Sequence, residues 1–130
     1  MRYPALKIAI MSLSFLWLSG CQQQQPAREV TAEKVNQLAA LIASAEWLRD
    51  HCQRSDIPSN AVVEQSANKL AEARGWMVST LSRQAMKDAA ERRYLAMSDD
   101  SILISQKCAQ LNQAAVPFIR DITSYPVKGK

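Results

Sequence analysis

Few residues in this chain of 130 could act as nucleophiles, and they do not form a catalytic set. The chain has one histidine and three cysteines, and His51 directly precedes Cys52. A cysteine nucleophile needs a base within hydrogen-bonding reach. Neighbouring residues of a helix point in different directions, so we predict that His51 is an ordinary residue near a helix end. No set of ligands has a metal-binding spacing, and we expect no metal, no cofactor and no enzymatic activity.

Cys21 follows a short apolar N-terminal segment. Arg2 and Lys7 precede an apolar stretch at 8–18, which two small residues separate from Cys21. This order is typical of a secretory signal peptide, and the stretch is shorter than the roughly 20 residues of a membrane span. Leu18-Ser19-Gly20-Cys21 resembles the bacterial lipoprotein box, which implies a signal peptide at 1–20 and lipidation of Cys21. An ordinary signal peptide with a chance cysteine, or an uncleaved anchor, is the alternative.

Residues 21–30 are expected to form the lipidated cysteine and a flexible tether, because a run of glutamines and Pro26 shows no periodicity. Loss of Arg2 and Lys7 with the signal peptide lowers the excess of basic over acidic residues from +4 to +2. So small a charge gives little support to a nucleic-acid partner. In the sorted lipoproteins that this segment resembles, an aspartate after the lipidated cysteine usually marks inner-membrane retention. Gln22 therefore favours delivery by the lipoprotein-sorting machinery to the outer membrane, with the domain in the periplasm.

Cys52 and Cys108 are the two cysteines left once Cys21 carries lipid. Two cysteines in an oxidising compartment indicate one disulfide. The loop that it would close is long enough to contribute about 4 kcal/mol by chain entropy. A pair of buried thiols is the alternative.

The remainder of the chain has a helical pattern, with apolar residues three and four apart and almost no glycine. Thr31 is expected to cap the first helix and Gly75 to end the second. Ser98-Asp99-Asp100 is expected to begin the fourth helix, and Pro117 to bend it or end it early. The helices are expected at 31–53, 60–74, about 79–97 and from 98 onward, with a frayed tail at 124–130.

Each expected helix has one apolar face, except the third, which is rich in alanine. Trp76 and Met77, after the second helix, are expected to point inward. Four amphipathic helices with short connections predict an all-α fold, a small four-helix bundle formed by residues 31–130. The faces comprise Val35, Leu38, Leu41, Ile42, Ala45, Leu48 and Cys52, then Val62, Val63, Ala67, Leu70 and Ala71, then Ile104, Cys108, Leu111, Ala115, Phe118 and Ile122.

Trp47 lies away from the main apolar face of its helix, among small residues and His51. The third helix is also short of bulky side chains, so a groove between the first and third helices could accept a partner helix. The alternative is that Trp47 covers a loop and the alanines let the bundle close tightly. The residues expected to contact a partner are Ala40, Ala43, Ser44, Trp47, Ala85, Met86, Ala89 and Tyr94.

Three segments of the chain resemble one known family. Residues 45–58 (AEWLRDHCQRSDIP) resemble the first-helix exit of the PulS/OutS family of type II secretion pilotins. Residues 73–76 (ARGW) are similar to the turn after that family's second helix, and residues 108–112 (CAQLN), with Pro117 and Phe118, to its last helix. The third helix matches only loosely.

The resemblance implies a fold, a partner and a role. Pilotins bind the C-terminal segment of a secretin, the ring-forming channel subunit, which becomes helical in a groove lined by the first and third helices. The lipid then brings the secretin to the outer membrane for assembly. The resemblance also implies a disulfide between Cys52 and Cys108. A periplasmic lipoprotein inhibitor or immunity protein, which would bind another protein with the same anchor and bundle, is the alternative function.

Overall fold

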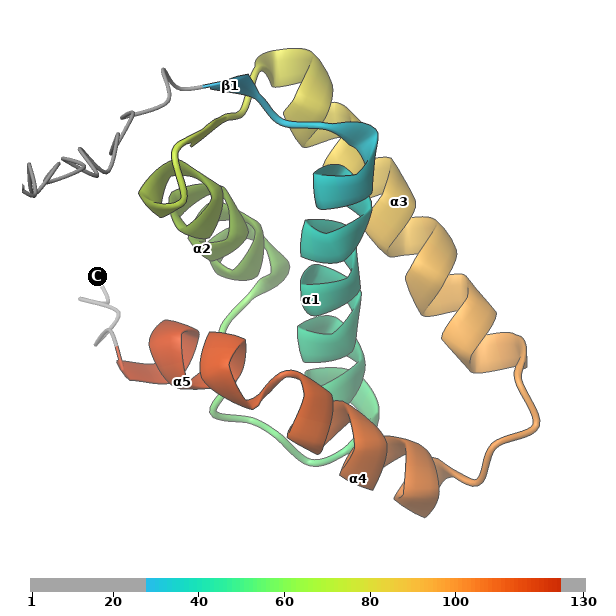
Figure 1. Ribbon diagram of the computed structural model, residues 1–130. Helices are drawn as coiled ribbons and strands as arrows, with labels where there is room; N and C mark the ends of the chain where they lie inside the picture. The colour runs from blue at the N-terminus through green and yellow to red at the C-terminus, as the bar shows by residue number, and fades with distance from the viewer. Residues whose placement is uncertain (1–27, 125–130) are drawn as a thin grey trace, which may run out of the picture.

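The computed structural model describes residues 28–124 and consists mainly of helices (Figure 1). The predicted signal peptide, Cys21 and most of the predicted tether lie outside the described residues. The all-α fold class is confirmed, although five helices replace the expected four. The elements are β1 (Arg28–Glu29), α1 (Ala32–His51), α2 (Asn60–Ala73), β2 (Trp76–Met77), α3 (Thr80–Asp99), α4 (Ile104–Ala114) and α5 (Val116–Ser124).

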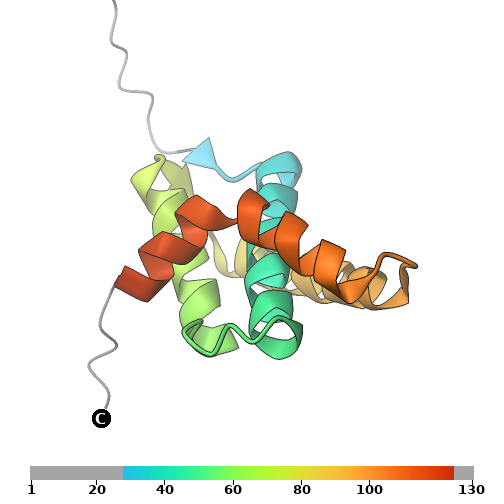
Figure 2. The ribbon, with the colours of Figure 1, turned by 90° about the horizontal axis from the view of Figure 1, so that it is seen from below.

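Helix α1 lies at the centre of the domain. α2 and α3 flank it on two sides, and α4 and α5 run across α1 and α2, as the view from below shows (Figures 1 and 2). Leu38, Ile42 and Leu48 of α1 are almost completely buried in a core that includes Val63 of α2 and Phe118 of α5. The apolar faces expected for the first two helices are thus confirmed as core surfaces.

Local sequence signals set most helix ends. The Thr31 hydroxyl accepts a hydrogen bond from the Lys34 N–H (3.4 Å), and the Ser79 hydroxyl accepts one from the Ser82 N–H (3.1 Å). These caps satisfy N–H groups that have no partner within the helix. Gly75 follows α2 with φ of +73°, a left-handed conformation that favours glycine.

The expected tether ends earlier than predicted. Arg28 and Glu29 form β1, which pairs in parallel with β2, and Val30 is buried in the core. Glu29 accepts hydrogen bonds from the Ser79 N–H and the Ser82 hydroxyl, which lowers the pKa of its carboxyl group. Met77 does not point inward as expected, because it lies in this exposed β-ladder and is 52% exposed. Trp76 is half-buried and contacts the core.

The boundary between the third and fourth helices also differs from the prediction. α3 continues to Asp99, and α4 begins only at Ile104. The Asp100 carboxylate accepts a hydrogen bond from the Ile102 N–H (3.1 Å), so the aspartate shapes a connection between helices instead of capping the next helix.

The expected interruption by Pro117 is confirmed. The helical chain breaks at Ala115 and resumes as α5, whose second residue is Pro117. Proline lacks an N–H and suits the first turn of a helix, where that donor would have no partner. None of the helices in residues 28–124 has the length and apolar character that a membrane span requires.

Candidate functional site

Helices α1 and α3 run side by side and bring several of the predicted partner-binding residues together (Figure 1). Ala43, Met86 and Ala89 are buried where the two helices meet. Small side chains allow the backbones of the two helices to approach closely, so these alanines already pack against the neighbouring helix of the same chain. A contact between these three residues and a partner stays a prediction, and the free domain leaves them little surface for it.

Trp47 is only 4% exposed, so the expectation that it lies on an exposed face is wrong. Its ring stacks on His51, with centroids 4.0 Å apart, and lies 5.3 Å from the Tyr94 ring. The Lys107 ammonium lies 4.7 Å from the ring centroid of Trp47. Its indole N–H has no hydrogen-bond partner within 28–124. The ring is therefore covered by His51 from its own helix, by Tyr94 from α3 and by Lys107 from α4.

Lys107 is a structural residue that the sequence analysis missed. Its side chain is buried, and its ammonium group donates to the Met97 carbonyl and pairs with the Asp100 carboxylate at 2.5 Å. The pairing lowers the pKa of the Asp100 carboxyl group, mainly through this hydrogen bond. We call this arrangement of Lys107, Asp100 and Trp47 the lysine latch, because it joins the end of α3 to α4. A lysine at 107 carries no signal in the sequence that distinguishes it from a solvated residue.

A hollow of about 490 Å³ lies beside α1 and α3. Ala40 and Ser44, both half-buried, follow Asn36 at intervals of four residues and therefore extend the same face of α1. Ala85 is exposed and stands one turn before Ala89 on α3. We call this surface the open flank: the hollow lined by Asn36, Ala89, Arg92, Arg93, Ala96, Met97 and Asp100, with Ala40, Ser44 and Ala85.

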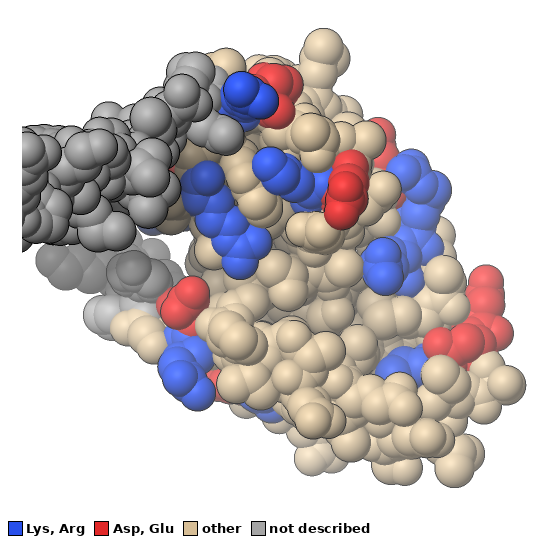
Figure 3. All heavy atoms as spheres, viewed as in Figure 1, with Lys and Arg blue, Asp and Glu red and all other residues tan. Residues whose placement is uncertain are grey.

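Apolar side chains extend from the connection between α3 and α4, beside Asp100. Ile102, Leu103 and Ile104 are 41%, 72% and 59% exposed. Ile104 was expected in the core, and its exposure corrects that prediction: it is the first residue of α4, one turn before Cys108. Single exposed apolar residues are common, but three consecutive ones form a patch of the kind that marks interaction surfaces. In Figure 3, uncharged side chains cover most of α4, and basic side chains lie over α3.

The disulfide between Cys52 and Cys108 is confirmed, with Cα atoms 5.6 Å apart. It joins the residue that follows α1 to the middle of α4 and therefore fixes α4 against the end of α1. The alternative of two free buried thiols is thereby excluded.

The segment after Cys52, which carries most of the family resemblance, has a structural role. Gln53 has φ of +58°, which turns the chain out of the helix. Arg54 donates two hydrogen bonds to Asp56 (both 2.8 Å) and one to the Asn112 side chain of α4 (2.5 Å). The guanidinium group lowers the pKa of the Asp56 carboxyl group. This segment therefore positions α4 and contributes no reactive group.

The other side of α3 is strongly acidic and includes Tyr94. The Tyr94 hydroxyl donates to Asp50 (2.8 Å) and lies 3.0 Å from His51 Nε2, so His51 is more than an ordinary helix-end residue. Burial and this hydrogen bond raise the pKa of Tyr94 to about 12. We call the hollow here, of about 510 Å³, the acidic groove; it is lined by Glu46, Asp50, Asn60, Glu64, Gln84, Lys87, Asp88, Ala90, Glu91, Tyr94 and Leu95.

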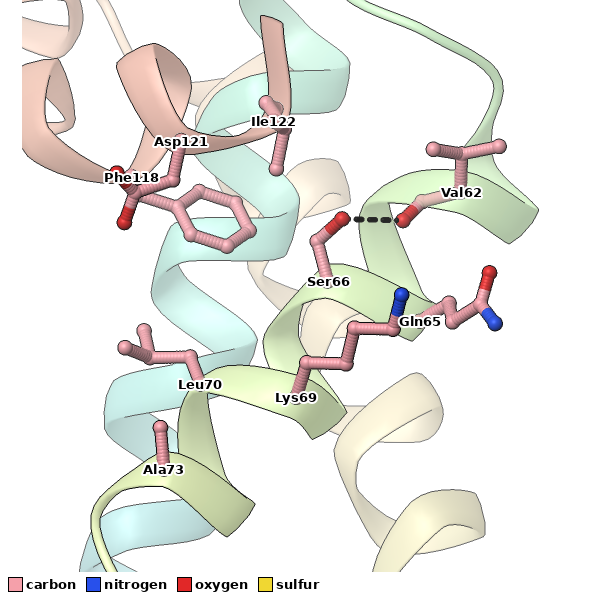
Figure 4. Close-up of a pocket in the computed structure, with 9 residues that line it drawn as sticks. All are labelled: Val62, Gln65, Ser66, Lys69, Leu70, Ala73, Phe118, Asp121 and Ile122. Carbon is pink, nitrogen blue, oxygen red and sulfur yellow. Dashed lines mark hydrogen bonds between the residues drawn. The ribbon is translucent and has the colours of Figure 1, made fainter. Parts of the chain in front are cut away.

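A third hollow, of about 400 Å³, separates α2 from α5 (Figure 4). Leu70, Phe118 and Ile122 give it apolar walls, and the Ser66 hydroxyl is already bonded to the Val62 carbonyl (2.8 Å). No predicted partner-binding residue lines this hollow. In the part of the chain that the structure describes, no cluster of His, Cys, Asp or Glu could hold a metal ion.

These features define a class of protein: a small helical domain, fixed by one disulfide, with extended surfaces between its helices. Residues 18–120 match the family described as type II secretion system pilotin lipoprotein (PulS_OutS). The chain belongs to this family, which confirms the resemblance found in the sequence.

Curated relatives agree with this assignment. The chain is 27% identical to the pilotin OutS of Dickeya dadantii (strain 3937), over 92% of this chain and 95% of that protein. It is 30% identical to the pullulanase secretion protein PulS of Klebsiella pneumoniae, over 82% of this chain and 87% of that protein.

Solved structures show the same fold. One similar chain comes from a structure described as a pilotin/secretin peptide complex, and it is 30% identical in sequence. The match covers 73% of this chain and 98% of that chain, with a TM-score of 0.65. A chain of the Klebsiella pneumoniae type II secretion outer membrane complex, described as PulD, PulS and PulC HR domain, is 26% identical. It covers 70% of this chain and 96% of its own, with a TM-score of 0.66.

Proposed function

We propose that this chain is an outer-membrane lipoprotein pilotin that binds the C-terminal segment of a type II secretion secretin. It then directs the secretin to the outer membrane for assembly, and acts by binding without catalysing a reaction. Membership of the pilotin family supports this role. The observation that carries it is the similarity to a pilotin in a pilotin/secretin peptide complex, which extends over nearly the whole of that chain.

The open flank is the surface that best fits an incoming helix. Ala40, Ser44 and Ala85 are small and retain exposed surface, so a helix can approach α1 and α3 closely along them. Ile102, Leu103 and Ile104 form an apolar patch at the end beside Asp100. The buried residues Ala43, Trp47 and Met86 pack beneath this surface and support it. Tyr94, at the acidic groove, supports Trp47 from the other side.

Burial of apolar surface is the main source of affinity in this arrangement. A segment that is disordered when free loses conformational freedom on binding, which lowers its affinity for a given contact area. Apolar contacts offset that cost at about 25 cal/mol per Å². The exposed patch at residues 102–104 supplies such area without any rearrangement of the core.

The N-terminal segment supplies the membrane attachment. We propose that residues 1–20 are a signal peptide, that Cys21 is lipidated, and that the polar run before β1 is the tether. Lipid chains on one cysteine hold a protein firmly on a membrane once there are about two or more of them. Gln22 after the lipidated cysteine favours transfer to the outer membrane by the lipoprotein-sorting machinery.

A binding titration tests the groove. Ser44→Trp places a bulky side chain where the incoming helix would lie. It should weaken binding of the secretin C-terminal peptide at least about tenfold, because loss of central interface contacts costs about 2 kcal/mol or more. Ala61→Trp, at an exposed position of α2, is the matched control and should bind like the wild type. Equal affinity of the two variants would show that the peptide binds elsewhere.

A localisation experiment tests the lipid. Cys21→Ala should leave the secretin away from the outer membrane, although the purified variant still binds the peptide. Membrane fractionation followed by detection of the secretin measures this outcome. Normal outer-membrane secretin in cells carrying the variant would contradict the proposed mechanism.

A further inference from the structure

We propose that the acidic groove is a second binding site, which takes an arginine side chain from a basic segment of a partner protein. The site is independent of the secretin-binding function proposed above, because it lies on the other side of α3 from the open flank. Its volume of about 510 Å³ falls within the roughly 300–1,000 Å³ typical of small-ligand sites.

The charges that line the groove are strongly unbalanced. Five carboxylates come from three helices, against a single cation, Lys87. Lys87 lies 3.8 Å from Glu64, and Arg49 pairs with Asp50. The remaining three carboxylates of the groove form no ion pair with any residue of 28–124. An excess of acidic groups around one concave surface attracts a cationic ligand.

Glu46 is the residue that indicates a missing partner. It is only 9% exposed, it lines the groove, and its carboxylate makes no hydrogen bond or ion pair with any residue of 28–124. Its oxygen atoms are not among the fully buried side-chain atoms that lack a partner, so they open into the groove. The rest of the side chain is shielded, and a carboxylate with little water around it attracts a cation more strongly. A cation in the groove would provide the missing interaction.

The neighbours of Glu46 form their hydrogen bonds with other groups, so the Glu46 carboxylate is available to a ligand. Asp50 accepts from the Tyr94 hydroxyl (2.8 Å) and from Arg49 (3.0 Å), and Asp88 accepts from Gln84 (2.8 Å). Arg49 itself also donates to the Pro58 carbonyl and the Asn60 side chain. Arg49 is therefore shared among several acceptors at the edge of the groove, and its charge only partly opposes the rise in the pKa of Glu46 that burial causes.

An arginine fits this arrangement better than a compact ion. Within the described residues, no group of carboxylates is close enough together to hold a metal ion. A guanidinium group has five donors in a planar fork and can bond to carboxylates that are several ångströms apart. Leu95, exposed at one end of the groove, offers an apolar surface for the methylene stem of the arginine.

Two matched peptides test the proposal. One is a short, acetylated and amidated peptide with a central arginine, and the other carries citrulline, which has the same shape without the charge. Each is titrated onto the isotope-labelled full chain in detergent micelles and followed by amide NMR. We expect the arginine peptide to bind about tenfold more tightly, because hydrogen bonds to charged groups are among the strongest. Shifts should be confined to 46–50, 60–64 and 84–95.

One variant and its control locate the site. Glu46→Gln should lower the affinity for the arginine peptide about fivefold or more, since it removes a charge-assisted bond. Glu33→Gln makes the same chemical change at an exposed position of α1 and should leave the affinity unchanged. Glu91→Gln, which removes an exposed carboxylate of the groove, provides a second variant that should also weaken binding.

Three results would overturn the proposal: equal affinity for the arginine and citrulline peptides, equal binding by Glu46→Gln and Glu33→Gln, or displacement of the arginine peptide by the secretin C-terminal peptide. Displacement would show that the acidic groove is not a separate site. If the secretin peptide fails to bind at all while the arginine peptide binds as expected, the proposed function fails and the second site stands.

Discussion

The two sides of α3 form hollows of similar size but of opposite chemical character. The acidic groove has five carboxylates and a network of side-chain hydrogen bonds. The open flank has Arg92 and Arg93, which form no ion pair with any residue between 28 and 124, together with alanines and an apolar patch next to it. The difference arises from helical spacing, because residues three or four apart share a side of the helix.

The two surfaces are suited to different kinds of partner. The open flank presents small and apolar groups, so an incoming helix gains affinity there by burial of apolar surface. The acidic groove presents charge, so it selects a ligand by electrostatic complementarity. The two surfaces share the α1 and α3 helix pair but differ in the elements that complete them. The acidic groove also takes Asn60 and Glu64 from α2, whereas the hollow of the open flank is lined by α1, α3 and Asp100.

Removal of the disulfide should have the largest effect on stability. It should also affect α4, beside the open flank, more than α2, beside the acidic groove. Replacement of both Cys52 and Cys108 by serine should lower the free energy of unfolding by about 4 kcal/mol, because the bond closes a long loop. The disulfide holds α4, so hydrogen exchange should increase more in α4 than in α2. Chemical denaturation and amide exchange measure both outcomes, and reduced wild type is the control. An equal increase in α2 and α4 would contradict this account.

Trp47→Ala should be the next most damaging change. A large buried aromatic residue lost from a packed site lowers the free energy of unfolding by about 3 kcal/mol. Trp47→Phe should cost less, because it keeps an aromatic ring and removes an indole N–H that has no partner. Urea unfolding compares the two variants. Equal stability of both would show that the ring contributes nothing to packing beneath the open flank.

Lys107→Met tests the lysine latch. The variant keeps the length of the side chain but loses the hydrogen bond to the Met97 carbonyl, which we expect to cost about 1.5 kcal/mol. Lys107 also lowers the folded-state pKa of Asp100. The Asp100 pairing therefore stabilises the fold above the ordinary pKa of an aspartate, and its effect disappears as the pH falls through the lowered value. Denaturation of wild type and variant across the acidic range should show a difference that shrinks at low pH; a constant difference would count against the latch.

Glu46→Gln should stabilise the free domain slightly at pH 7, because partial burial disfavours the charged form of the carboxyl group. Burial raises the folded-state pKa of Glu46 above its ordinary value. The folded state thus binds the proton more tightly, and the penalty develops as the pH rises from the unfolded to the folded pKa. The gain from the substitution should vanish at lower pH, where both states are protonated. Glu33→Gln, with no gain at any pH, is the control.

Local signals in the sequence predicted the helices and their ends well. Thr31, Ser79 and Gly75 act where their capping or turn chemistry suggests, and Pro117 follows directly after a helix break. The prediction failed at Ser98-Asp99-Asp100, because serine and aspartate suit a turn as well as a helix start. Only the tertiary contact of Asp100 with Lys107 distinguishes the two possibilities.

The candidate site was less predictable than the fold. The pattern correctly identified Trp47 as unusual, but one helix cannot reveal that Lys107, sixty residues later, covers its ring. Glu46 likewise looks like a solvated residue in the sequence, because its burial depends on how α2 and α3 meet α1. The depth of the hollows on the two sides of α3 also required the tertiary structure.

A charge comparison on α3 gives the smallest effect on stability and the most direct test of which side binds the secretin. Arg92→Gln with Arg93→Gln and Asp88→Asn with Glu91→Gln each remove two charges from the same helix, on opposite sides. Both pairs should change the free energy of unfolding by less than about 0.5 kcal/mol, as most surface substitutions do. Charges at the rim of an interface mainly affect the association rate and its salt dependence. Stopped-flow measurements with the secretin C-terminal peptide should therefore detect the arginine pair and not the acidic pair. The opposite result would place the peptide in the acidic groove, because the stability of the two variants is matched and only the side of α3 differs.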